Sequence, residues 1–272
     1  MNIKNITTSC FCDCILRKDY YFTVISNFDC NLQCKNCINC APLVGQPNLN
    51  FPEIDYEKTC ETVKYFKNLG FKMVNISGGE TLLYPKIFDL IRFCNSLGLC
   101  TTVNTNGLLI PKIKIPDDIL SLLKSDRIRF IVSKKGKYFD NSKAIDFLEK
   151  NKLSYRFSDT GNYKFNKVKI TKEKNLDTKQ IFKCIHCCPQ ILNDKIYFCS
   201  VAFRKEIFNL DYIENDLVFE YNHFKSIKDI KNVLTKKFKL CQNCSLSSNF
   251  EEEEITKSSL KIEEFVEVKR NF

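Results

Sequence analysis

Between residues 20 and 170, short apolar runs alternate with longer amphipathic stretches, and this alternation limits the choice of fold. The expected strands cover residues 20–26, 71–77, 99–105, 127–133 and 154–157, with a sixth candidate at 167–171. The expected helices cover residues 55–69, 85–97, 116–124 and 141–150. Strands that alternate with helices form parallel sheets. Because five or six strands and four helices fall short of an eight-fold barrel, we expect an α/β fold with a partial barrel.

Three cysteines follow the first expected strand, at Cys30, Cys34 and Cys37, with the spacing C-x3-C-x2-C. The loops after the strands build the active sites of such barrels, so these thiols lie where chemistry is expected. Three thiolates are one short of the four that close an ordinary cluster, so a [4Fe–4S] cluster held by them keeps one iron open. An open iron favours an enzyme over an electron carrier. Cys40 extends the series to C-x2-C-x2-C, so a ferredoxin-like cluster is the rival interpretation.

The chain has 16 cysteines among 272 residues, with no apolar stretch long enough to span a membrane and no signal peptide. We therefore expect a cytoplasmic protein in which metal ligation explains most of the cysteines, because a reducing compartment disfavours disulfides. Cys60, Cys94 and Cys100 stand singly in apolar segments and are expected to be buried. The formal charge of +10 is spread along the chain, so we expect a solvated basic surface and no nucleic-acid or membrane partner.

Further motifs follow the next three expected strands. They are Ser77-Gly78-Gly79-Glu80, Asn104-Thr105-Asn106-Gly107 and a serine at Ser133. In this order, and with the cysteine loop, they resemble the motifs of the radical S-adenosylmethionine (SAM) superfamily. The resemblance implies SAM on the open iron, glycines that admit the cofactor and a glutamate that meets its ammonium group. The residues that it places at SAM are Gly78, Gly79, Glu80, Asn104, Thr105, Asn106 and Ser133.

The chain departs from the superfamily pattern next to these motifs. Thr81 stands where members usually have proline, which is a mild difference. Asn36 stands where an aromatic residue commonly packs beside the adenine, so the adenine contacts are undetermined while the iron ligation is unaffected. Under this interpretation Cys40 is a neighbouring thiol, since a fourth thiolate would prevent SAM from chelating the iron.

Residues 172–250 differ in character, with short apolar runs and a second set of six cysteines. They resemble the auxiliary-cluster module called Twitch, the shorter relative of the SPASM domain. The resemblance implies an auxiliary iron–sulfur cluster suited to electron transfer. Its four ligands would be Cys184, Cys199, Cys241 and Cys244. Cys187 and Cys188 are alternatives to Cys184, and a structural zinc site is the alternative to a cluster.

These patterns predict three parts. A radical SAM partial barrel covers residues 1–171, the Twitch or SPASM-like module covers 172–250, and a charged helix or tail covers 251–272. The cysteines at positions 10, 12 and 14 are spaced awkwardly for one cluster and are interpreted as incidental, with redox-active thiols as the alternative.

The resemblance also implies an activity, in which SAM is cleaved reductively and a 5′-deoxyadenosyl radical abstracts hydrogen from a substrate. The layout resembles the aminocyclitol dehydrogenase of butirosin biosynthesis and members associated with surface polysaccharides. We therefore expect an oxidoreductase for a small polar substrate, sugar-like or anionic, with flavodoxin or ferredoxin as electron donor. One alternative is a maturase that modifies a peptide, although no N-terminal segment is long enough for a leader-binding domain. The other is an electron-transfer or zinc protein without radical chemistry.

The sequence singles out no catalytic base. Four polar residues near strand ends or the module junction are candidates for substrate contact, although surface or structural roles are favoured for each. They are Arg129, Arg156, Asp159 and His186.

Overall fold

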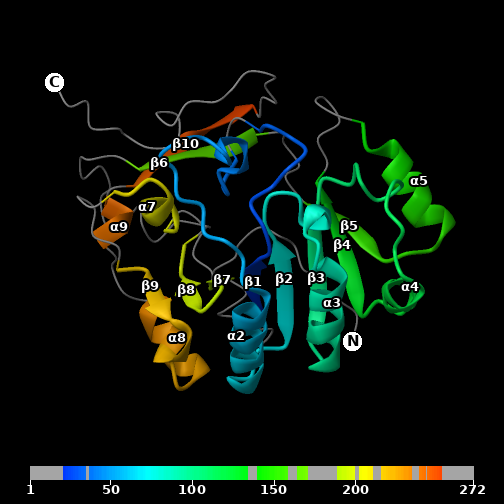
Figure 1. Cartoon of the computed structure of the whole chain (residues 1–272), viewed down its shortest axis with the longest axis horizontal. Helices are drawn as coiled ribbons and strands as arrows, with labels where there is room; N and C mark the ends of the chain where they lie inside the picture. The colour runs from blue at the N-terminus through cyan, green and yellow to red at the C-terminus, as the bar shows by residue number, and fades with distance from the viewer. Residues whose placement is uncertain are drawn as a thin grey trace.

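A computed structural model describes residues 21–34, 37–133, 140–158, 164–170, 189–199, 202–210, 216–234, 239–242 and 244–252. Its main element is an eight-stranded sheet with the strand order β5-β4-β3-β2-β1-β7-β8-β9 (Figure 1). Neighbouring strands from β5 to β7 are parallel, whereas β8 and β9 join by antiparallel pairing. The sheet is open, which confirms the expected partial barrel.

The barrel half of the chain follows the predicted alternation. Its strands are β1 (Tyr21–Ile25), β2 (Met73–Ser77), β3 (Cys100–Thr105), β4 (Ile128–Ser133) and β5 (Tyr155–Ser158). Its helices are α2 (Tyr56–Asn68), α3 (Ile87–Ser96), α4 (Asp117–Lys124) and α5 (Ser142–Lys150), with short 3-10 turns at η1 (Ala41–Leu43) and η2 (Thr81–Leu83). The first five predicted strands and all four helices are therefore confirmed, with ends that differ by at most two residues.

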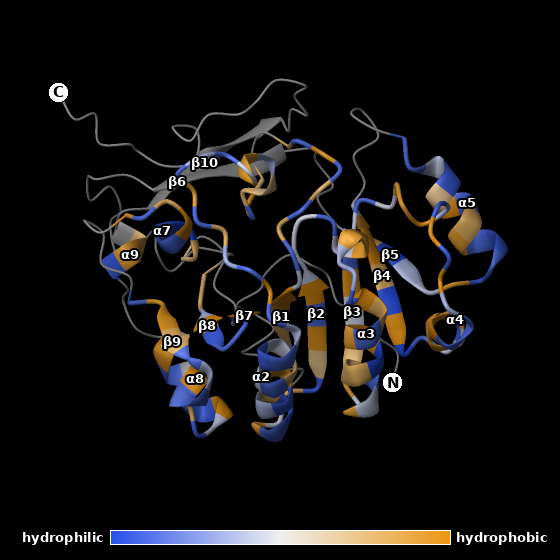
Figure 2. Cartoon of the chain, in the orientation of Figure 1, coloured by the Kyte–Doolittle hydropathy of each residue, from blue (hydrophilic) through white to orange (hydrophobic). Residues whose placement is uncertain are grey.

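Helix α2 shows why these segments form and where they pack. Asp55 caps its first turn by accepting a hydrogen bond from the Lys58 amide, which satisfies one of the free N–H groups of the helix start. Its apolar side packs on the sheet, where Phe66 lies 4.8 Å from the Phe22 ring of β1, measured between centroids. Figure 2 shows the resulting distribution, with apolar residues along the central strands and helices that are polar on one side.

The sixth parallel strand is not the predicted one. The segment predicted at 167–171 forms β6 (Lys164–Ile170), which pairs antiparallel with β10 (Cys244–Glu252) in a separate two-stranded sheet. The sixth parallel strand is β7 (Gln190–Leu192), which pairs with β1. An apolar run marks a strand without marking its partner, so the sequence did not distinguish the two sheets.

The rest of the described chain consists of short elements. They are β8 (Lys195–Tyr197), α7 (Arg204–Ile207), β9 (Val218–Glu220), η3 (Tyr221–His223), α8 (Ile227–Leu234) and α9 (Lys239–Gln242). A core of aromatic rings supports them, with Phe198 5.6 Å from Phe219 and 5.5 Å from Phe224 between centroids. Glu251 and Glu252 end β10, so these first residues of the predicted tail form strand and not helix. The predicted boundary at residue 171 stays a prediction, although β7 supplies the barrel sheet with a strand from beyond it.

Among the described helices, none has both the length and the apolar character needed to cross a bilayer.

Candidate active site

The carboxyl ends of the parallel strands meet at one edge of the sheet, and the predicted motifs lie there together. The register aligns Ile25 at the end of β1 with Ser77 at the end of β2. It also aligns Thr105 at the end of β3 with Val132 in β4. The cysteine loop, the glycine pair and the two later motifs therefore follow neighbouring strand ends, as expected for the active-site edge of a barrel.

Backbone hydrogen bonds join the loop after β1 to the loop after β2. The Gly79 amide donates to the Asn27 carbonyl at 3.0 Å, and the Glu80 amide donates to the Asp29 carbonyl at 2.7 Å. The Asn27 side-chain amide donates to the Glu80 carbonyl at 3.0 Å. These bonds end at the residue before Cys30, so they fix where the cysteine loop begins.

Glycine is required at positions 78 and 79 by this close approach. A Cβ on Gly78 would lie 2.5 Å from the Asn27 carbonyl oxygen, and a Cβ on Gly79 would overlap the Asp29 carbonyl oxygen. The resemblance assigned these glycines to the approach of a cofactor. In the structure the missing side chains leave room for the backbone of the loop that carries the cysteines. Contact of these glycines with SAM stays a prediction.

Glu80 joins the ends of β2 and β3 through its buried carboxylate, which is 1% exposed. One oxygen, Oε1, accepts from the Thr105 hydroxyl at 2.7 Å and from the Leu82 amide at 3.1 Å. The other, Oε2, accepts from the Asn106 amide at 2.8 Å. Burial raises the pKa of Glu80, while these three bonds act in the opposite direction. A carboxylate accepts about four hydrogen bonds, so the described residues leave one acceptor position for a further donor.

Asparagine side chains complete the connections between the strand ends. Asn106 donates to the Asn31 side-chain oxygen at 2.7 Å, which ties the end of β3 to the residue after Cys30. Asn141, at the start of α5, donates to the Ser133 carbonyl at 2.9 Å and to the Asn106 carbonyl at 3.4 Å. Sequence reasoning missed Asn27, Asn31 and Asn141, since asparagine after a strand also marks an ordinary turn.

Asn106→Ala tests this network. The variant leaves Asn31 and the Leu108 amide without their partner, so we expect a loss of about 1–2 kcal/mol in the free energy of unfolding. Urea unfolding of the metal-free chain measures this loss. The control is Asn151→Ala, whose exposed side chain bonds the Phe147 carbonyl and whose loss we expect to stay within about 0.5 kcal/mol. Equal losses in the two variants would contradict the role given to Asn106.

The three cysteines of the loop are half-buried. Burial raises the pKa of the Cys30 thiol to about 12; a hydrogen bond from the Leu32 amide opposes this rise, and the nearby Cys37 and Glu80 add to it. A bound metal supplies the missing stabilisation of the thiolate, because ligation releases the proton. In the described ranges no three His, Cys, Asp or Glu side chains converge on a single ion position. A cubane cluster needs no such convergence, because each thiolate binds a different iron, so the donor set of Cys30, Cys34 and Cys37 fits a cluster.

Comparison with known proteins bears on this geometry. No family model matches the chain. An S-adenosylmethionine-dependent nucleotide dehydratase of Flammeovirga pacifica is 35% identical over 83 residues, which cover 30% of this chain and 29% of the relative. A GTP 3′,8-cyclase of Chlorobaculum tepidum is 27% identical over 139 residues, which cover 47% of this chain and 40% of the relative. These relatives agree with the resemblance that the cysteine loop and the strand-end motifs indicate. These likenesses and the strand-end motifs point to the radical SAM superfamily.

The extent of these likenesses is limited. The chain spans well under half the length of the two curated relatives described above. The crystal structure of BtrN in complex with AdoMet and 2-DOIA is similar over 90% of this chain and 99% of that chain, with 16% identity and a TM-score of 0.48. At this TM-score the likeness carries no functional argument.

The predicted auxiliary ligands of this chain are described only in part. Cys199 is buried after β8, Cys241 is half-buried in α9 and Cys244 begins β10. Three candidate first ligands, Cys184, Cys187 and Cys188, lie outside the described residues. The auxiliary cluster and its zinc alternative therefore both stay predictions.

The remaining sequence candidates have separate outcomes. Cys60 and Cys94 are buried, as predicted, whereas Cys100 is half-buried at the start of β3 and lines a pocket. Asn104 is half-exposed on β3, and nothing in the structure assigns it a ligand. The candidates outside the described residues are Asn36, Asp159, His186 and the cysteines at positions 10, 12 and 14.

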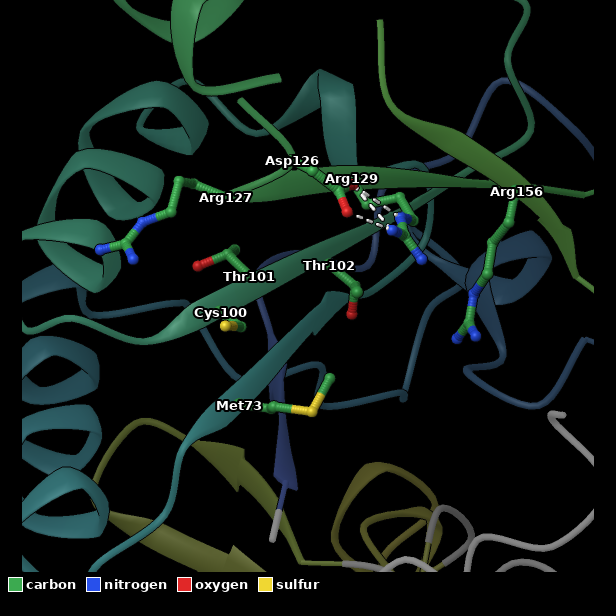
Figure 3. A pocket seen from close by; sticks show the side chains of 8 residues that line it. All are labelled: Met73, Cys100, Thr101, Thr102, Asp126, Arg127, Arg129 and Arg156. Carbon is green, nitrogen blue, oxygen red and sulfur yellow. Dashed lines mark hydrogen bonds and ion pairs between the residues drawn. The ribbon is translucent and has the colours of Figure 1, made fainter. Parts of the chain in front are cut away.

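Two of the polar candidates, Arg129 and Arg156, line a pocket at the edge of the sheet opposite the cysteine loop (Figure 3). Arg129 forms an ion pair with Asp126 at 2.6 Å, so part of its charge is already balanced. This pairing supports the structural role favoured for Arg129. The other lining residues are Met73, Cys100, Thr101, Thr102 and Arg127.

Proposed function

We propose that this radical SAM enzyme cleaves SAM reductively at a [4Fe–4S] cluster held by Cys30, Cys34 and Cys37, and oxidises a small polar substrate. The cluster would supply the electron, and the resulting 5′-deoxyadenosyl radical would abstract hydrogen from the substrate. The auxiliary cluster, with Cys199, Cys241 and Cys244 among its ligands, would accept an electron from the substrate radical. Flavodoxin or ferredoxin is the proposed reductant.

The observation that carries the proposal is the hydrogen-bonded contact of three strand ends around the cysteine loop. Asn27 and Asp29, before Cys30, bond the glycine-glutamate motif, and Asn31, after Cys30, bonds Asn106. The loop that holds the proposed cluster is thereby fixed beside Glu80. The free acceptor position of this carboxylate suits the ammonium group of SAM.

Polar side chains on the face of the sheet opposite α2 support a polar substrate. The register places Thr23, Asn75 and Thr102 on one face of three adjacent strands. Asn75 donates to the Thr23 hydroxyl at 3.3 Å and accepts from the Thr102 hydroxyl at 2.9 Å. Closed barrels of this class fill the same positions mainly with Val, Ile and Leu. A face with hydroxyl and amide groups instead suits a ligand that forms hydrogen bonds.

The choice of test substrates follows from this face and from the relatives. Sugars and aminocyclitols match a surface of hydroxyl and amide groups. Nucleoside phosphates are the second class, since the relatives described above are named for nucleotide and GTP chemistry. Both classes belong in the panel.

Anaerobic reconstitution with iron and sulfide, followed by SAM and dithionite, tests the proposal. We expect 5′-deoxyadenosine, measured by liquid chromatography, in the wild-type reaction, and its loss when Cys30, Cys34 and Cys37 are all changed to alanine. Cys94→Ala serves as the matched control, because its thiol is buried on α3 and we give it no role in ligation. A wild-type yield no higher than that of the triple variant would refute radical SAM activity. A higher yield of 5′-deoxyadenosine in the presence of one substrate class would identify that class as the substrate class.

A further inference from the structure

Cys40 presents a problem for a site that needs an open iron. The thiols of Cys34, Cys37 and Cys40 recur at intervals of three residues, a spacing that also occurs in ferredoxins that bind clusters through four thiolates. A fourth thiolate on the cluster would occupy the position proposed for SAM. An open iron therefore requires that Cys40 does not bind the cluster.

The backbone turns Cys40 into the protein. Its amide donates to the Cys37 carbonyl at 3.2 Å, and its φ of 55° is in the left-handed region, which bulky residues rarely adopt. Its side chain is 0% exposed among apolar neighbours such as Leu43, whereas Cys30 and Cys37 are half-buried. The fourth thiol thus lies in the core behind the loop.

Arg204 holds this turn from behind. It comes from α7, in the second half of the chain, and is 2% exposed. Its Nη2 donates to the Ile38 carbonyl at 3.1 Å and to the Cys37 carbonyl at 3.4 Å. Its guanidinium also faces the Cys40 thiol: burial raises the pKa of that thiol to about 12, and the charge and hydrogen bond of Arg204 act in the opposite direction.

A buried guanidinium is a costly way to fill this space. Replacing a buried charged group with apolar side chains of similar volume is often neutral or stabilising, so packing alone does not explain an arginine here. An arginine can instead orient the turn: its Nη2 donates to two carbonyls, and its guanidinium also forms a hydrogen bond with the sulfur beside them. Those three contacts fix which thiols of the loop face outward.

We propose that Arg204 is a positioning residue that keeps Cys40 out of the cluster and so leaves the fourth iron open for SAM. The inference rests on the proposed function. Without Arg204, the turn from Cys37 to Cys40 is released. The Cys40 thiol then gives its proton to solvent, and its sulfur replaces the exogenous ligand of the fourth iron. One iron–sulfur bond forms, one bond to the exogenous ligand breaks, and no electron is transferred.

Four proteins test this: wild type, Arg204→Met, Cys40→Ala and the double variant. Each is reconstituted anaerobically and reduced with dithionite, and the electron paramagnetic resonance spectrum of its cluster is recorded with increasing SAM. Because the barrel cluster must be observed alone, all four are made in a background with Cys199, Cys241 and Cys244 changed to alanine, and iron content is measured for each. A parallel set retains these three cysteines and checks that the background itself does not remove the response.

We expect the wild type and Cys40→Ala to show a SAM-dependent change of the cluster spectrum. Arg204→Met should keep its iron but show no spectral change, or show it only at SAM concentrations about tenfold higher or more. Losses of this size are typical for residues that orient metal ligands. The double variant should regain the change, because the competing thiol is gone. This recovery separates displacement by Cys40 from a general loss of structure.

An unaltered SAM response in Arg204→Met would overturn the inference, as would a double variant that does not recover. Loss of iron in Cys40→Ala alone would also overturn it, since Cys40 would then be a ligand. If Arg204→Met does not fold, Arg204→Gln and its double variant are scored by the same outcomes, and the iron content of Cys40→Ala remains decisive on its own. A wild type with a cluster but no SAM response in either set would instead refute the proposed function, and the inference with it.

Discussion

Replacing Gly79 with alanine should lower the free energy of unfolding by about 3 kcal/mol, near the upper end of the cost of overpacking. The added Cβ would overlap the Asp29 carbonyl oxygen, which is backbone and cannot move aside as a flexible side chain would. To relieve the overlap, the loops after β1 and β2 must separate and break the bonds that Asn27 and Asp29 accept. We therefore also expect poor retention of iron after reconstitution. Urea unfolding of the metal-free chain and an iron assay measure the two effects.

Gly45→Ala is the matched control for this prediction. Gly45 has a φ of +82°, and a Cβ there would meet nothing within 4 Å. Its replacement costs only the strain of a left-handed residue, about 1–2 kcal/mol, and should leave iron retention unchanged. If Gly79→Ala loses no more stability than Gly45→Ala and keeps its iron, the close contact between the two loops is wrong.

Glu80→Ala should also have a large effect, a loss of about 3 kcal/mol in the free energy of unfolding. The variant removes the acceptor of the Thr105 hydroxyl and of the Asn106 amide, and it leaves both donors buried. Glu80→Gln should lose less, because the amide oxygen still accepts a hydrogen bond. Similar stability of Glu80→Ala and the wild type in urea would show that the carboxylate does not join the strand ends.

The pH dependence of stability gives a second readout for Glu80. Burial raises the pKa of its carboxyl above the ordinary value of 4.5, so the folded chain binds this proton more tightly than the unfolded chain does. The stability that Glu80 contributes is therefore fully present below about pH 4.5 and is lost as the pH rises through the folded-state pKa. Glu80→Gln does not titrate. Measured across pH 4 to 8 without metal, wild-type stability should fall relative to Glu80→Gln, and a relative rise would contradict the shift.

The residues that the sequence identified are those with a local signature. The alternation of β1 to β5 with their helices follows from hydrophobic periodicity, and the motifs after β1 to β4 were found because parallel strands place their carboxyl ends together. The connections between those motifs have no such signature. Asn31 and Asn106 bond each other across the ends of two strands that are not neighbours in the sheet, and Arg204 reaches the cysteine loop from the other half of the chain. Contacts of this kind depend on how the sheet twists and on which strands pair.

The exchange of β6 for β7 has the same origin. Both segments satisfy the pattern of a strand, and the later one takes the place beside β1 through only two register pairs, Thr23 with Gln190 and Val24 with Ile191. Pairing preference at this length is set by the packing of the surrounding elements. A single sequence does not contain that information in a readable form.

The pairing of β7 with β1 has a consequence for synthesis and assembly. While the ribosome is still making the second half of the chain, β1 has its β2 neighbour but lacks the partner on its other side. The Thr23 amide finds its acceptor only when Pro189 has been added. A nascent or prematurely ended chain would thus expose the unpaired edge of β1, which could pair with another copy of the chain. Expression of fragments that stop before β7 is consequently a poor route to an isolated barrel.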